Sequence, residues 1–475
     1  MVARALSAGL YVLVWTLGLS DQLAGLPVLG QAAGVALALF LVLELPRQRR
    51  YAQVFFVAMA ALGCVGLLTT QHPVSLLLDA LRRGAVYAAF FFALATLRDA
   101  AEHSVLIRRC GQHLVAQPPG RRYLALTAGG HLFGIILSYG AIELLGAMVV
   151  RANTLASAGG SAAVRTLRAR RMLMAIYRGF AVMNCWSPLN LMTAVVSTAV
   201  PGAPMRLLLP IAFVVSVGMG AIGWIDDRLH TPPRAGAPSP PASAENWPIH
   251  LRVVGLVALV MALSEAAVAV LGITLVTAVT LVVPTVALVW AALQCHGRAR
   301  SKRVALGLLM RRLGRFVVRV PEFRGEANVL GLSGFVGVAL GAALPAGGLG
   351  FLSLLPPLAI PLLVPVLLMA TGQIGLNPVA TVALLGAMLP DPYALGVAPA
   401  VLGFACMLGW GVGVSVTAMS ASAITTARWL GVSPFVVSVL WNTRFTLGCL
   451  VLSWAAIAAL HYGGPAMLPW AFPSG

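Results

Sequence analysis

Asp391 is the only charged residue between Ala327 and Ala427. A soluble domain needs charged and polar side chains over its whole surface, whereas a chain inside a lipid bilayer must avoid them. The same bias holds for the complete chain of 475 residues, of which 60% are hydrophobic and 9% are charged. Because helices satisfy their own backbone hydrogen bonds in lipid, we predict an all-α polytopic membrane protein.

The positive charge of the chain has the distribution expected for membrane loops. Arginine supplies nearly all of the formal charge of +19, Lys302 is the only lysine, and the arginines cluster in short segments between apolar runs. This is the positive-inside pattern, so nucleic acid is not expected as a partner. The six cysteines lack the spacing of metal sites and lie mostly in or beside apolar runs, so we expect neither disulfides nor a metal ion.

The first four spans can be placed from apolar runs of about 20 residues. They are Ala5–Ser20, Pro27–Leu45, Ala52–Thr70 and Ala85–Leu97. The N-terminal run could instead be a signal peptide, but no small-x-small cleavage site precedes Asp21, so we interpret it as a retained span. Arg47, Arg49 and Arg50 place the turn after the second span in the cytoplasm, which makes the N-terminus cytoplasmic too.

The segment from Tyr123 to Val150 carries no Lys or Arg, yet basic clusters flank both of its ends. A single crossing would place one of these clusters outside, contrary to the positive-inside pattern. We therefore predict a re-entrant hairpin that enters and leaves on the cytoplasmic side, with Ser138-Tyr139-Gly140 at its tip. A second hairpin, entering from outside, is predicted around Thr371-Gly-Gln-Ile-Gly-Leu-Asn-Pro378.

A proline-rich polar stretch divides the chain into halves. Residues 226–250 are too poor in apolar side chains to fold or to span, so we interpret them as a cytoplasmic linker. Residues 27–225 and 251–475 then form two repeats, each with a re-entrant hairpin and a broken helix, and residues 1–26 form an extra N-terminal transmembrane helix. An odd number of crossings per repeat inverts the second relative to the first, and the total is about 11 transmembrane helices.

One segment in the second half is rich in arginine, unlike the apolar spans on either side of it. Between Arg298 and Arg324, arginines alternate with apolar groups such as Val304-Ala-Leu-Gly-Leu-Leu-Met310. Charges at this density prevent the segment from crossing a bilayer, but its apolar residues favour contact with one. We predict an amphipathic helix that lies at the membrane surface.

Each predicted repeat contains one apolar crossing that is interrupted by Gly, Pro or small polar residues. The first interruption is Asn184-Cys-Trp-Ser-Pro-Leu-Asn190, and the second lies within Gly411-Val-Gly-Val-Ser-Val-Thr-Ala-Met-Ser420. Paired interruptions of this kind are typical of transporter binding sites, because unpaired backbone groups are tolerated in lipid only around an enclosed cavity. A proline kink, or Ser and Thr side chains that only mediate helix contacts, are the alternatives. The candidate substrate-binding residues at the interruptions and the second hairpin are Asn184, Ser187, Asn190, Gln373, Asn377, Ser415, Thr417 and Ser420.

Ionisable residues inside predicted spans complete the candidate site. Arg178 precedes the first interruption and could attract an anionic substrate, or it could reach the cytoplasmic surface as a positive-inside residue. Glu143, on the first hairpin, could bind a proton or a cation, or pair with a nearby arginine. With Ser138 and Ser422 it forms the candidate ion-coupling set. No arrangement of residues indicates a catalytic site, so no catalytic residue is predicted.

Three short motifs give the chain a family resemblance. Gly375-Leu-Asn-Pro378 resembles a hairpin element of the large membrane subunit of TRAP transporters, and Asn184-x-x-Ser-Pro-x-Asn190 is similar to the break in the first discontinuous helix of arsenite permeases. Ser415-Val-Thr-Ala-Met-Ser-Ala-Ser422 resembles the break in the second. These proteins belong, with the divalent-anion/sodium symporters, to the ion transporter superfamily. The chain lacks the Ser-Asn-Thr signature of the symporter hairpins, so the resemblance specifies neither a dicarboxylate nor sodium.

The sequence therefore predicts a secondary active transporter in the cytoplasmic (inner) membrane. It would move a small anionic solute coupled to a cation gradient, because two half-helix N-termini and Arg178 give the site a positive field. Na+ and H+ remain open as coupling ions, and no other cofactor is expected. The expected partners are the solute and the lipid bilayer, and a homodimer stays open. The alternative function is an integral membrane enzyme acting on a lipid-linked substrate.

Overall fold

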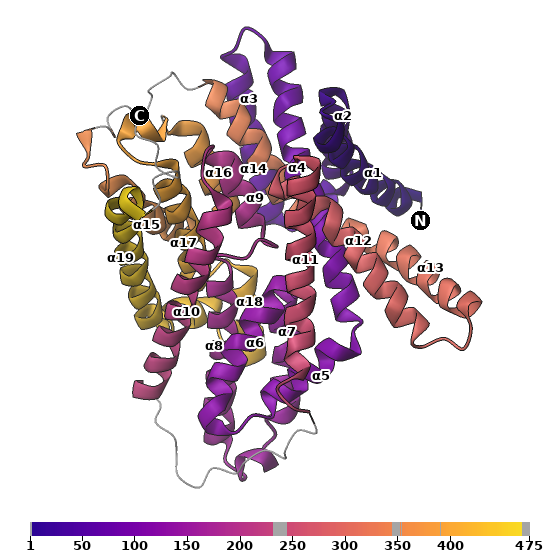
Figure 1. The fold of residues 1–475 in the computed structure, drawn as a ribbon, viewed down its shortest axis with the longest axis vertical. Helices are drawn as coiled ribbons and strands as arrows, with labels where there is room; N and C mark the ends of the chain where they lie inside the picture. The colour runs from indigo at the N-terminus through magenta and orange to yellow at the C-terminus, as the bar shows by residue number, and fades with distance from the viewer. Residues whose placement is uncertain (1, 231–244, 344–351, 353, 390, 468–475) are drawn as a thin grey trace. The chain divides into compact units, whose positions relative to one another are not determined.

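All secondary structure that the structure describes is helical (Figure 1). The computed structural model describes residues 2–230, 245–343, 352, 354–389 and 391–467. Within these ranges, nine helices are long and apolar enough to cross a membrane, and two shorter apolar helices accompany them. The chain is therefore an all-α, multi-pass membrane protein, as the sequence predicts.

The helices belong to two compact units. Unit 1 comprises residues 1–103, 259–351 and 379–390, and unit 2 comprises residues 104–258, 352–378 and 391–475. Each unit thus combines segments from both predicted repeats. All the candidate site residues named above belong to unit 2.

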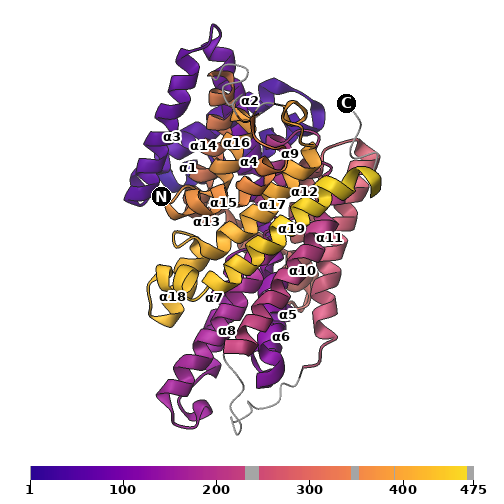
Figure 2. The ribbon, with the colours of Figure 1, turned by 90° about the vertical axis from the view of Figure 1, so that its left-hand side faces the viewer.

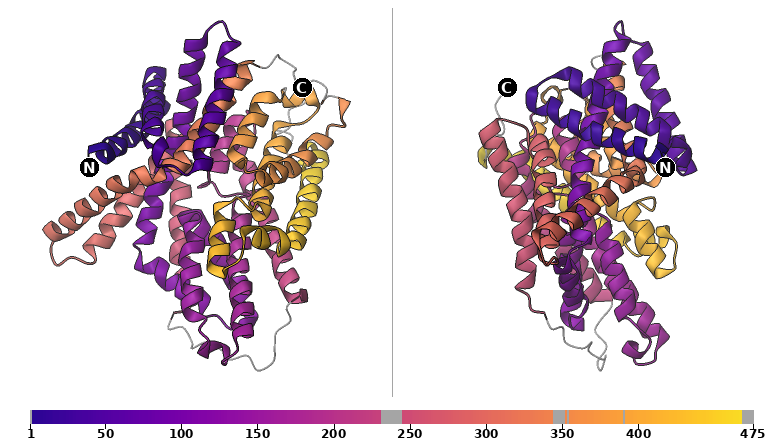
Figure 3. Two further views of the ribbon diagram at one scale, coloured as in Figure 1. Left: turned by 180° about the vertical axis from the view of Figure 1, so that it is seen from behind. Right: turned by 90° about the vertical axis from the view of Figure 1, so that its right-hand side faces the viewer.

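Unit 1 is built around α4 and α14, which lie side by side. Gly84 of α4 allows this approach, because a Cβ atom there would meet the backbone carbonyl of Gly331 on α14. The N-terminal helices α1 and α2 pack against the same core (Figures 1 and 3). The Tyr11 ring of α1 stacks on Phe40 of α2 at 4.8 Å between centroids. The helices of this unit are α1 (Val2–Ala24), α2 (Pro27–Glu44), α3 (Arg50–Leu68), α4 (Pro73–Glu102), α12 (Leu275–His296), α13 (Lys302–Arg319), α14 (Arg324–Ala343) and, apart from Pro378, α16 (Pro378–Met388).

Helix α4 is longer than the sequence predicts. The predicted span Ala85–Leu97 leaves out the preceding turns because they contain Arg82 and other charged residues. In the structure the Arg82 guanidinium donates two hydrogen bonds to the Asp21 carboxylate of α1, at 2.7 and 2.8 Å. Pairing with Asp21 neutralises the charge, so the helix begins at Pro73.

Unit 2 contains both interrupted helices and the first hairpin. Its helices are α5 (Val105–Val115), α6 (Pro119–Leu137), α7 (Gly140–Ala152), α8 (Ala162–Met183), α9 (Leu191–Ala199), α10 (Met205–His230), α15 (Ala359–Gln373), α17 (Pro399–Val416), α18 (Ala421–Leu430) and α19 (Thr443–Met467). Helix α11 (Ile249–Leu271) starts in unit 2 and ends in unit 1. Within unit 2, α17 contacts both α15 and α19, as Figure 2 shows.

The predicted linker starts too early. Helix α10 continues through Asp226 and Asp227 to His230. Both carboxylates pair with arginines of α8: Asp226 with Arg178, and Asp227 with Arg171. Sequence composition alone assigned these acidic residues to the linker because their partners lie about 50 residues away along the chain. Residues 231–244, the proline-rich part of the linker, lie outside the described residues.

Candidate functional site

The first interruption is closed by its own asparagines. Helix α8 ends at Met183, and α9 begins at Leu191 with Asn190 as its N-cap, accepting from the backbone N–H of Met192 at 3.2 Å. Asn190 Nδ2 donates to Asn184 Oδ1 at 2.5 Å, and Asn184 Nδ2 donates to the Phe180 carbonyl at 2.7 Å. The two side chains therefore join the end of one half-helix to the start of the next.

Ser187 lies at the middle of this interruption and is fully buried. Its carbonyl accepts a hydrogen bond from Thr193 Oγ1 at 2.9 Å. Its hydroxyl has no hydrogen-bond partner among the described residues. A buried hydroxyl without a partner is costly, so Ser187 Oγ is the polar atom of this interruption that is available to a ligand.

At the second interruption, serine and threonine side chains bond to the backbone on both sides of the break. Helix α17 ends at Val416, and Ser420 caps α18 by accepting from the backbone N–H of Ala423 at 3.1 Å. Thr417 Oγ1 donates to the Gly413 carbonyl at 2.7 Å, and Ser420 Oγ lies 3.1 Å from Ser422 Oγ. The Ser420 hydroxyl thus satisfies a backbone N–H that the break leaves unpaired, whereas the Thr417 hydroxyl adds a second donor to a carbonyl that already accepts from the Thr417 N–H.

Three other elements of unit 2 reach the carbonyl end of α17. Gln373, at the end of α15, donates to the Val416 carbonyl at 2.7 Å. Tyr177 of α8 donates to the Ser415 carbonyl at 3.0 Å, and Asn442, just before α19, donates to the same carbonyl at 2.7 Å. The second interruption is therefore the point at which α8, α15, α17 and the start of α19 meet.

The approach of α15 to this point requires glycine. A Cβ atom at Gly372 would collide with Thr417 Oγ1. Asn377 follows in the turn between α15 and α16, where Gly375 has a positive φ of 84°. The helix ends at Gln373, so the amide of that residue lies where it can donate to the last turn of α17.

The two interruptions lie at different levels of unit 2. Helices α8 and α17 run antiparallel, since Tyr177 is opposite Ser415 whereas Cys185 Sγ is 3.9 Å from the Leu408 carbonyl. Along α8, Asn184 lies seven residues beyond Tyr177, or about 10 Å at 1.5 Å per residue. The polar residues of the two interruptions therefore form two clusters.

Arg178 is enclosed by protein groups. Its guanidinium donates to Asn442 Oδ1 at 2.8 Å, to the Tyr123 hydroxyl at 3.1 Å and to Asp226 Oδ2 at 2.8 Å. The remaining two N–H groups donate to the carbonyls of Gly223 and Trp441, both at 3.3 Å. An arginine has five N–H donors, so none is left for a substrate. Arg178 instead connects α8 through Asn442 to the second interruption.

Glu143 also has a protein partner. Its carboxylate on α7 forms an ion pair with Arg428 of α18 and lies 3.5 Å from Thr425 Oγ1. Ser138, at the turn between α6 and α7, has a positive φ of 52°, which is unusual for a residue other than glycine. Leu145 of α7 lies beside Gly129 of α6, so the two helices form an antiparallel hairpin whose second helix contacts α18.

Sequence reasoning missed two residues of this site. Tyr177 and Asn442 both donate to backbone carbonyls at the end of α17. A buried tyrosine or asparagine in an apolar helix must find a hydrogen-bond partner, which was the available signal. The carbonyls lie at least 237 positions from Tyr177 and 27 from Asn442 along the chain, so the sequence could not identify them.

By its fold, the protein is an all-α, multi-pass membrane protein with two interrupted helices and a helical hairpin gathered in one compact unit. No protein-family model and no curated protein matches the chain. Among solved structures, it is similar to the crystal structure of the YdaH transporter from Alcanivorax borkumensis, which is described as having an unusual topology. The identity is 16%, the TM-score is 0.54, and the match covers 87% of this chain and 98% of that chain. This likeness shows a shared fold.

Proposed function

We propose that the protein is a secondary active transporter that moves a small anionic solute across the cytoplasmic membrane, coupled to a cation gradient. The observation that carries the proposal is the pair of interrupted helices in unit 2, α8–α9 and α17–α18, each broken at polar residues. Such breaks in membrane helices hold substrates and coupling ions in secondary transporters. The fold shared with a transporter structure supports the same function.

The solute site is centred on the second interruption. Gln373 brings an amide to the place where α15 meets the end of α17, and one of its two N–H groups is used by the Val416 carbonyl, which leaves the other for an anion. Thr417 and Ser420 add hydroxyl oxygens, whose protons are donated to backbone carbonyls. The N-terminus of α18 begins there, and the positive end of its dipole favours an anion. Arg178 does not contribute a ligand, because all of its donors are occupied within the protein.

The coupling cation would bind on the carbonyl side of the same interruption. The end of α17 presents the carbonyls of Val414, Ser415 and Val416, where the helix dipole is negative. A carbonyl oxygen has two lone pairs, so those of Val414 and Val416 can each accept a donor and still contact a cation. The free hydroxyl of Ser187 offers a second polar point at the first interruption.

Ligand binding to purified protein tests this assignment. A thermal-shift screen of small carboxylates and oxyanions, with Na+ or at varied pH, should identify solutes that stabilise the protein. Gln373→Ala should weaken anion binding by about fivefold or more, because it removes an amide N–H that can donate a hydrogen bond worth about 1 to 3 kcal/mol. Thr417→Ala should weaken the dependence of binding on the cation, because it removes a hydroxyl oxygen at the end of α17. Gln112→Ala and Thr166→Ala are matched controls at exposed positions of unit 2 and should leave binding unchanged. Binding of cationic or neutral solutes alone would contradict an anionic substrate.

A further inference from the structure

Helix α13 of unit 1 differs from its neighbours in charge. Its 18 residues include six basic side chains and no acidic one. Six charges in one helix exclude a position across the hydrocarbon core. The helix nevertheless exposes large apolar side chains, among them Leu306 at 56% and Met310 at 56%.

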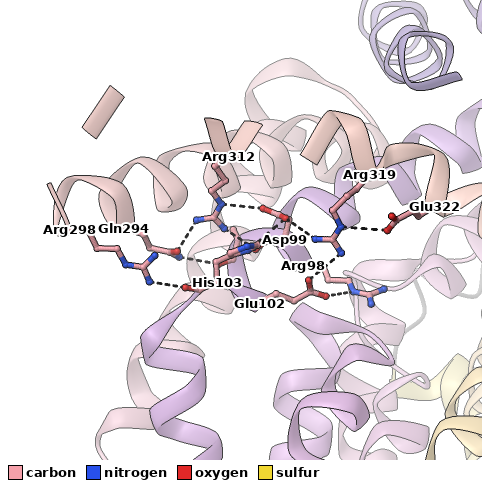
Figure 4. Close-up of polar contacts among 10 residues, drawn as sticks. Arg98, Asp99, Glu102, His103, Gln294, Arg298, Arg312, Arg319 and Glu322 are labelled. Carbon is pink, nitrogen blue, oxygen red and sulfur yellow. Dashed lines mark hydrogen bonds and ion pairs between the residues drawn. The ribbon is translucent and has the colours of Figure 1, made fainter. Parts of the chain in front are cut away.

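Ion pairs fix α13 across the ends of two membrane-spanning helices (Figure 4). Arg312 donates to the Asp99 carboxylate in the last turn of α4 at 3.2 Å, and to Gln294 in the last turn of α12 at 3.0 Å. Arg319 lies 3.8 Å from Asp99 and 3.9 Å from Glu102, which ends α4. Because α4 and α12 are both candidate spans that end here, α13 lies at the boundary between membrane and water.

The outer surface of α13 combines cations with apolar groups. Leu306, Met310 and Val317 are spaced by four and seven residues, so they share one exposed face of the helix. The helix also exposes four basic residues: Lys302 and Arg303 flank this face, whereas Arg311 and Arg315 lie further round the exposed side, in line with the exposed Val304 and Val318. Unlike Arg312 and Arg319, none of these four pairs with a carboxylate in the part of the chain that the structure describes.

We propose that this outer surface of α13 binds the headgroups of anionic phospholipids in the leaflet that it lies on. Apolar side chains at the interface insert between acyl chains, while guanidinium groups next to them bind phosphate. A second copy of the chain is a poorer partner, because a two-fold contact through this face would place its four unpaired cations against four identical ones. The inference rests on the membrane location of unit 1 and not on the transport activity.

Lipid selectivity at α13 can be measured with one fluorophore. Gly307 lies between Arg303 and Arg311 on the helix, and a Cβ atom there meets nothing within 4 Å, so Gly307→Cys provides a labelling site. Cys64→Ser removes the only exposed native cysteine. The labelled full-length protein is placed in phosphatidylcholine nanodiscs that contain the same small fraction of spin-labelled phosphatidylglycerol or spin-labelled phosphatidylcholine. Stronger quenching by the former reports enrichment of anionic lipid at α13.

The proposal predicts that phosphatidylglycerol is enriched about fivefold or more at the label. Arg311→Gln/Arg315→Gln should reduce the enrichment towards unity, whereas Arg311→Lys/Arg315→Lys should retain most of it. Arg49→Gln/Arg50→Gln removes the same charge from exposed positions elsewhere in unit 1 and should not reduce it. If the first variant does not fold, high salt should abolish the enrichment in the parent protein.

Three results would overturn the proposal. One is equal quenching by both lipids in the parent protein. Another is an equal loss of enrichment in the Arg311/Arg315 and Arg49/Arg50 glutamine variants, which would assign it to total charge rather than to α13. The third is a label shielded from both lipids in particles that contain two chains, which would assign this face to a second copy.

Discussion

The role of Arg178 changes between sequence and structure. Sequence position suggests an anion ligand, but the guanidinium is buried and bound to five protein acceptors. We predict that Arg178→Gln destabilises the protein by about 3 kcal/mol, because it removes a buried guanidinium with five hydrogen bonds and leaves the Asp226 carboxylate only the exposed His230 beside it. Thermal unfolding in detergent measures this effect.

Two comparisons make the Arg178 prediction specific. Adding Asp226→Asn to Arg178→Gln should restore part of the lost stability, since the half-buried carboxylate that lost its arginine is then uncharged. Arg165→Gln, at an exposed position of the same helix, should change stability by less than about 0.5 kcal/mol. If Arg178→Gln is as stable as the parent and only loses affinity for anions, Arg178 is a ligand after all.

Cys110 provides a residue-level test outside the spans. It is buried on α5, which is not one of the candidate membrane spans, and burial raises the pKa of its thiol to about 11. The thiol therefore stays protonated, and unreactive towards maleimide, from pH 7 to pH 9. Mass spectrometry after labelling of the folded protein should find Cys64 modified and Cys110 intact. Rapid modification of Cys110 at pH 7 would show that its thiol is not buried against the start of α11.

The hairpin formed by α6 and α7 leads to a prediction about topology. If it enters and leaves on one side, its two basic flanks share a face of the membrane. Single cysteines at Arg108 and Arg165, both exposed, should therefore be labelled only from the cytoplasmic side, and Tyr393→Cys only from outside. All three are made in a Cys64→Ser background. Labelling of the Arg108 and Arg165 positions from opposite faces would mean that the segment crosses the membrane.

At the scale of elements, local signals in the sequence located the interruptions well. Asn190 and Ser420 are good N-caps, so the starts of α9 and α18 follow from the sequence. The extent of α4 and α10 did not follow, because their charged residues are neutralised by partners elsewhere in the chain, such as Asp21 for Arg82. Apolar runs indicate where helices can form, but ion pairs decide how far they continue.

At the scale of the molecule, the predicted repeats and the observed units divide the chain differently. Each unit takes segments from both halves, so contacts within a unit join residues such as Tyr177 and Ser415 that are far apart in sequence. Periodicity and composition predict the class of the protein, but they carry no information on such long-range pairing. The convergence of α8, α15 and α17 on the second interruption therefore emerged only from the structure.

Uptake into proteoliposomes tests the central claim most directly. With an anion selected by the binding screen, wild-type protein should accumulate it inside the vesicles against its concentration gradient when an inward Na+ or H+ gradient is imposed. Thr417→Ala should lose this accumulation while staying folded, and Thr166→Ala should retain it. Uptake that only equilibrates the solute, with the same rate whether or not a cation gradient is present and the same rate in Thr417→Ala, would contradict both the coupling and the site.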